Sequence, residues 1–132
     1  MPEENIISRD WNDITAFYLD KNYRTEGLKY NHGLDALGKL CSWISSSGYS
    51  KNLFAFTSHH RLNIFQSPPQ YPQCLLIQHL NLTPTEDGRV QFVFIDTFKE
   101  SRQWKRSANQ NDICKRLESF MLQVGWINHL SK

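Results

Sequence analysis

The sequence predicts an α+β domain: an antiparallel meander sheet of about three to five strands, with helices packed mainly on one face. Two observations predict this class. Apolar residues recur at helical spacing near both ends of the chain. Between them, short runs rich in Phe, Ile and Leu are separated by turn-forming residues. Short connections place consecutive strands side by side, so we expect two helices, a meander and a final helix.

The composition indicates one domain. The chain has 132 residues, of which 39% are hydrophobic, and we expect a single domain over residues 1–132 with a mobile lead-in over residues 1–9. No run approaches the ~18–20 apolar residues that a membrane span requires. The first residues are acidic where a signal peptide is basic. Three widely spaced cysteines favour reduced thiols. We therefore expect a cytoplasmic protein with no membrane contact.

The two N-terminal helices are predicted from their apolar stripes. The first begins after Asp10, whose side chain caps the first turn, and ends near Asn22. Residues 23–33 are polar and contain two glycines, so we interpret them as a loop. Gly48 is expected to end the second helix in the left-handed conformation. The stripe of that second helix consists of Leu34, Leu37, Leu40, Cys41 and Ile44.

The pattern then changes to strands. Residues 53–57 are rich in Phe, and residues 61–66 alternate between apolar and polar. The short link over residues 58–60 predicts a hairpin between them. Residues 66–73 contain three prolines, which favour a stiff surface loop over regular structure.

Two further strands are expected over residues 74–80 and 90–96, joined by turn chemistry at residues 83–88. Both strands are apolar on both faces, which is typical of central strands covered on two sides. Either the N-terminal helices cover the second face, or that face meets a ligand or another subunit. Residues 97–107 are polar around Trp104 and are expected to begin as a loop and end as a short edge strand.

The last helix is predicted from residue 109 or 111 to residue 124. Its apolar face consists of Ile113, Leu117, Phe120, Met121 and Val124. Gly125 is a natural stop, and Trp126 is expected to fold back onto the final turn.

A basic and aromatic segment is the first candidate site. It contains Lys99, Arg102, Trp104, Lys105 and Arg106, and Lys115 and Arg116 on the last helix are expected to extend it. Cations neutralise phosphates and a Trp face stacks on a base, so this mixture is typical of a surface for single-stranded nucleic acid. The structural alternative is an edge strand guarded by charge, with Trp104 as its core anchor.

A second candidate is the run His59, His60 and Arg61 in the predicted hairpin. Histidines bind metals and carry protons near neutral pH. The alternative is an exposed turn, which is favoured because no ligand-type spacing accompanies the pair. We accordingly expect no metal and no cofactor.

Thiol, carboxylate and proline features are weaker candidates. If the 83–88 turn pairs Asn81 with Arg89, Cys74 lies opposite Asp96, a neighbour that would raise the pKa of the thiol. Asp96 also suits the cap of the following turn. Residues 69–72 have the form of a Pro-x-x-Pro docking peptide or of a rigid connection. The two other cysteines, Cys41 and Cys114, are interpreted as core residues.

The chain contains no phosphate-binding glycine loop, paired-cysteine zinc motif, nucleophile elbow or His-Glu-x-x-His helix. The leading hypothesis is therefore a non-enzymatic binding or interaction module. It would self-associate through a sheet face or an exposed edge, or bind a protein partner or a small apolar ligand. One alternative is weak nucleic-acid binding through residues 99–106. Another is a small enzyme that uses a histidine or Asp96.

Overall fold

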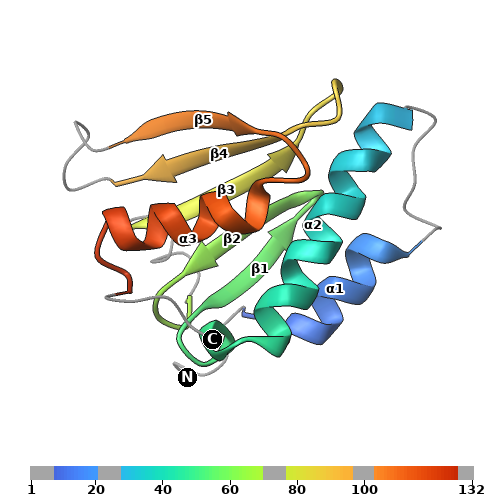
Figure 1. Ribbon diagram of the computed structural model, residues 1–132. Helices are drawn as coiled ribbons and strands as arrows, with labels where there is room; N and C mark the ends of the chain where they lie inside the picture. The colour runs from blue at the N-terminus through green and yellow to red at the C-terminus, as the bar shows by residue number, and fades with distance from the viewer. Residues whose placement is uncertain (1–7, 21–27, 70–76, 97–102, 128–132) are drawn as a thin grey trace.

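The computed structural model describes residues 8–20, 28–69, 77–96 and 103–127; of residues 28 and 29 it describes the backbone only. Five strands form one antiparallel sheet in the order β1-β2-β3-β4-β5. The strands are β1 (Phe54–Ser58), β2 (Arg61–Phe65), β3 (His79–Pro84), β4 (Val90–Ile95) and β5 (Trp104–Ala108). The helices are α1 (Trp11–Leu19), α2 (Leu28–Ser46), the 3-10 turn η3 (Gly48–Lys51) and α3 (Ile113–Gln123). Figure 1 shows α1, α2 and α3 on one face of the sheet, which confirms the predicted fold class.

The core lies between that face and the helices. Alternation along each strand places one set of apolar side chains toward the helices: Ala55, Leu62, Ile64, Leu80, Leu82, Val90, Phe92, Phe94 and Ala108, all buried. The helices cover them with the predicted stripes, including Leu37 and Leu40 of α2 and Leu117 and Met121 of α3, each fully buried. The buried helix faces predicted from the spacing of apolar residues are therefore confirmed.

Helix α1 begins as predicted, because the Asp10 carboxylate accepts a hydrogen bond from the backbone N–H of Asn12 at 2.7 Å. It ends at Leu19, where Asp20 turns to extended backbone, before the Asn22 we expected. Arg9, the last residue of the expected lead-in, donates its N–H to the carbonyl of Ala55 in an isolated β-bridge beside β1.

The loop predicted over residues 23–33 is wrong from Leu28 onward, where α2 already begins. Gly33 lies inside this helix because it permits a close approach to β3. A Cβ there would lie 2.7 Å from the Cβ of Pro84. Gly48 does not take the left-handed conformation; it begins η3, and the side chain of Ser47 accepts from the N–H of Tyr49 instead.

Strand β3 begins and ends later than predicted, since Thr83 and Pro84 belong to it and the turn is confined to residues 85–88. Gly88 carries the positive φ of +85° that closes this turn. The register changes accordingly: Asn81 pairs with Val93, so the predicted pairing of Asn81 with Arg89, from which the Cys74–Asp96 neighbourhood was inferred, is wrong. Cys74 itself lies outside the described residues.

The shift also changes the second face of the sheet. On β3 this face carries His79, Asn81 and Thr83, which are polar, so the expectation of an apolar strand on both sides is wrong here. On β4 the second face does carry apolar side chains, Val93 and Ile95, both half-buried. The three helices all pack on the first face. The N-terminal helices therefore do not cover the second face.

The C-terminal helix ends as predicted. Gly125 has φ +80°, and the N–H of Trp126 donates to the carbonyl of Met121 at 2.8 Å. This closure returns the indole to the core, where its ring centroid lies 5.0 Å from that of Phe120. Residues 97–102 lie outside the described part of the chain, and β5 is the short edge strand expected after them.

Candidate anion-binding groove

A groove separates β5 from α3, with a cavity of about 230 Å³. The pairing of β5 with β4 turns Trp104, Arg106 and Ala108 toward the helix side of the sheet, opposite Phe94, Phe92 and Val90. The facing flank of α3 contributes residues at helical spacing. The lining consists of Phe92, Trp104, Arg106, Ser107, Ala108, Arg116, Ser119, Phe120 and Gln123. The groove therefore has an aromatic floor and a polar rim.

Arg106 is held in place by two contacts within its own strand. Its Cζ lies 5.4 Å from the ring centroid of Trp104, a cation–π distance. Its Nη1 donates to the carbonyl oxygen of Lys105 at 3.0 Å. Trp104 is fixed in turn by an edge-to-face contact with Phe120, at 5.4 Å between centroids and 74° between planes. The guanidinium is therefore oriented before any ligand arrives.

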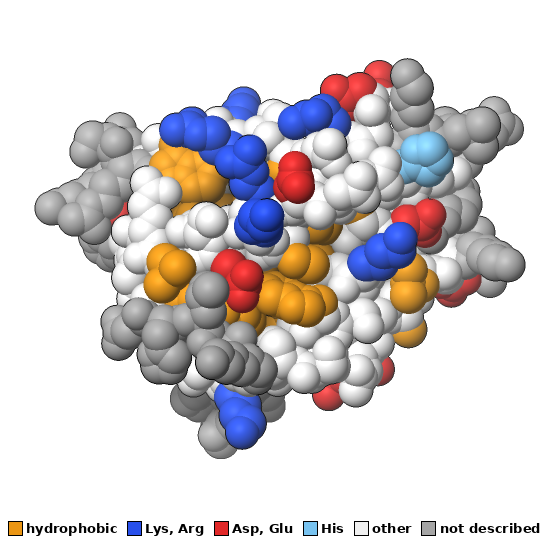
Figure 2. Space-filling view, viewed as in Figure 1, with side chains coloured by type: hydrophobic (Ala, Val, Ile, Leu, Met, Phe, Trp, Pro, Cys, Tyr) orange, Lys and Arg blue, Asp and Glu red, His pale blue; other side chains and the backbone are white. Residues whose placement is uncertain are grey.

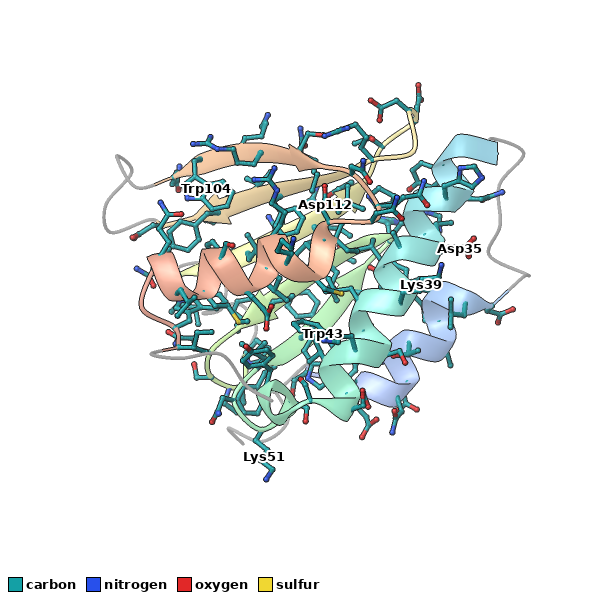
Figure 3. The ribbon with its side chains drawn as sticks, in the orientation of Figure 1. Asp35, Lys39, Trp43, Lys51, Trp104 and Asp112 are labelled. Carbon is teal, nitrogen blue, oxygen red and sulfur yellow. The ribbon has the colours of Figure 1, made fainter. Side chains whose placement is uncertain are left out.

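Neither arginine of the groove is neutralised within the described residues. The side chains of Arg106 and Arg116 are exposed, and no described carboxylate forms an ion pair with either. Figure 2 shows basic side chains gathered where β5 and α3 lie in Figure 1. Figure 3 places Asp112 at the start of α3, at the far end of the groove from Trp104. The field inside the groove is therefore positive around the two guanidiniums.

The outer edge of β5 is covered by arginines. Arg106 donates from Nη1 to the carbonyl oxygen of Lys105. Arg89 donates from Nε to the Ser107 hydroxyl at 2.7 Å and from Nη2 to the Ser107 carbonyl at 3.4 Å. Lys105 and Ser107 are alternate residues, so their carbonyls point to the same side of the strand. A further strand would need these acceptors, and two charged side chains already bind them.

The groove unites part of the predicted basic segment. Trp104 and Arg106 line it, whereas Lys105 projects from the other face of β5, since alternate residues of a strand point to opposite sides. Lys99 and Arg102 lie outside the described residues. Arg116 joins the groove as expected, and Lys115 does not line it.

The turn that contains His59 and His60 lies apart from the β5–α3 groove. His59 is exposed with φ +57°, while His60 is half-buried against α1 and α2. The Nδ1 of His60 lies 2.8 Å from the Oη of Tyr30, and its backbone carbonyl accepts from Tyr18. Arg61, also exposed, begins β2. These contacts explain the pair as a packed hairpin turn, remote in the fold from β5 and α3.

The other titratable candidates are also dispersed. His79 stacks on Phe65 on the second sheet face at 4.8 Å, and burial lowers its pKa. Asp96 is buried on the first face and accepts from Nε2 of Gln78 at 3.0 Å. Burial raises the pKa of the Cys41 thiol inside α2. Among the described residues, no group of three His, Cys, Asp or Glu side chains is placed to hold a metal ion.

Sequence reasoning did not find the groove itself. Ser119 and Gln123 belong to it, together with the aromatic floor of Phe92 and Phe120. The available signal was spacing: Arg116, Ser119 and Gln123 recur at three and four residues beside the predicted apolar stripe of α3. The sequence alone does not show which strand this flank of α3 faces.

No protein-family model, curated protein or solved structure matches this chain. Within the described residues, no helix has both the length and the apolar character needed to cross a membrane.

Proposed function

We propose that the protein is a non-enzymatic binding module whose β5–α3 groove binds an anionic ligand. The observation that carries this proposal is the convergence of Arg106 and Arg116, from a strand and a helix, on one cavity without a described carboxylate partner. Guanidinium groups present fixed forks of donors that match the oxygens of phosphate and carboxylate. The Ser119 hydroxyl on the same wall supplies a further donor.

The same contacts argue against self-association through β5, one form of our leading sequence hypothesis. Pairing of two β5 edges would displace Arg89 and Arg106 from the carbonyls they bind. Binding of a free anion does not require this displacement. Binding of a small apolar ligand is also less favoured, because the rim of this groove is charged. A cytoplasmic location stays a prediction from the sequence.

Isothermal titration calorimetry with inorganic tripolyphosphate at low ionic strength tests the proposal. Arg106→Gln and Arg116→Gln should each weaken binding about tenfold or more, since a hydrogen bond to a charged group contributes roughly 1.5–3 kcal/mol. Arg61→Gln is the matched control, because Arg61 is an exposed arginine on β2 outside the groove.

Equal losses in all three variants would show a diffuse charge effect and overturn the proposal. Absence of any measurable heat with the unmodified protein would do the same.

A further inference from the structure

A second hollow, of about 560 Å³, adjoins the groove along the end of α3. Trp104 and Gln123 line both, so the two hollows share one wall. The second is lined by Gln78, Phe94, Trp104, Leu122, Gln123, Val124 and Gly125. The lining that the structure describes for it contains no charged side chain, in contrast to the first.

We infer that the two hollows together hold one nucleotide unit of a single-stranded nucleic acid. The phosphate lies against Arg106 and Arg116, and the unpaired base enters the second hollow beside Trp104. This inference rests on the proposed anion-binding function and specifies its ligand. In this arrangement the base lies beside Trp104 and not on the ring face that the Arg106 guanidinium covers.

The second hollow suits a base because it combines apolar walls with amide groups. Leu122 is 42% exposed, one of the most exposed large apolar side chains that the structure describes, and it faces this hollow. Gln78 uses its Nε2 to bind Asp96, which fixes the amide, and no described group donates to its Oε1. The Gln123 amide offers both a donor and an acceptor. Unstacked bases are held in this way, by apolar contact and by hydrogen bonds to their edges.

Charge complementarity favours a polyanion over a single small anion. Arg106, Lys115 and Arg116 are exposed on β5 and α3, and Arg89, just before β4, is exposed and bonded to Ser107 of β5. Figure 2 shows Lys and Arg side chains over the region where β5 and α3 lie in Figure 1.

Two other polyanions fit less well. An acidic peptide would bind most naturally as an added strand on β5, where the carbonyls of Lys105 and Ser107 already accept from arginines. A duplex keeps its bases paired and stacked, so none is free to enter a hollow.

Fluorescence anisotropy with two labelled ten-nucleotide probes separates the base from the phosphates. One is oligothymidine and the other is an abasic strand of the same length and charge. The base-bearing strand should bind about tenfold or more tightly, since only its bases can make the apolar contacts and edge hydrogen bonds of the second hollow. Leu122→Ala should reduce this preference several-fold without changing binding of the abasic strand. Leu19→Ala, at an equally exposed leucine of α1 (44%), should change neither.

The outcomes distinguish the two claims. Equal affinity for both strands, or an equal effect of the two leucine variants, would overturn the inference and leave the anion groove intact. Polyglutamate binding as tightly as oligothymidine would also overturn it, in favour of an acidic protein partner. If the strands and tripolyphosphate all fail to bind, both claims fall together.

Discussion

Replacement of Phe94 by alanine tests the core on which the groove is built. Phe94 is 1% exposed and lies at the centre of an aromatic cluster. Its ring centroid is 5.2 Å from that of Phe120, 6.1 Å from that of Trp104 and 6.5 Å from that of Trp126. Truncation of a buried Phe costs about 3–5 kcal/mol, and the loss of three ring contacts places this site near 4–5 kcal/mol. For a chain of 132 residues this corresponds to a fall in Tm of about 15 °C.

Urea denaturation followed by far-UV circular dichroism measures the change in the free energy of unfolding, and a thermal scan gives the Tm. Leu122→Ala on α3 is the control, since Leu122 is 42% exposed and should lose less than about 1 kcal/mol. Refutation would come from a loss below about 1 kcal/mol for Phe94→Ala, or from equal losses in the two variants. Either result would mean that the helix-covered face of β4 is open.

Two further predictions concern α2 and the second sheet face. Gly33→Ala should destabilise the protein by roughly 1–2 kcal/mol, because the added Cβ would meet the rigid ring of Pro84. Gly38→Ala should be close to neutral, because its Cβ would meet the exposed and movable side chain of Leu19, whose Cγ is 2.8 Å away. Equal free energies of unfolding for the two variants would contradict this. Burial lowers the pKa of His79; Arg61 adds to this effect and the Ile77 carbonyl opposes it. The unfolded chain therefore binds the proton more readily than the folded chain. Stability should fall as the pH drops below about 6.5 toward the pKa of His79 in the folded state. His79→Gln should flatten that fall between about pH 7.5 and 5.5 in urea titrations, and an unchanged slope would show that another group is responsible.

Much of the fold was predictable because the spacing of apolar residues indicates which face of a helix or strand is buried. The stripe of α3 and the alternation of β2 each identified the correct face. The errors arose where a local signal and a tertiary contact disagree. Gly33 reads as a loop residue, yet it lies in a helix because Pro84 approaches closely. Pro84 reads as a turn residue, yet it ends β3.

The candidate site was only partly predictable for a related reason. Trp104 and Arg106 were identified from composition, but composition does not say which helix flank faces an edge strand. That required the register of β5 on β4, in which Arg106 lies opposite Phe92 on the helix side. Composition also did not indicate that the Arg106 guanidinium lies over the Trp104 ring.

The strictly sequential order of the strands has a consequence for how the chain acquires its structure. Each strand pairs only with its neighbours in sequence, so every ladder closes a short loop and the entropy lost at each step is small. A chain emerging residue by residue can extend the sheet from β1 toward β5 without ever opening a pair already formed. Contacts of long sequence separation form where the helices pack on the sheet and on each other, as α2 does on β3 and α3 does on α2. The groove between β5 and α3 is therefore completed only after β1 to β4 have been synthesised.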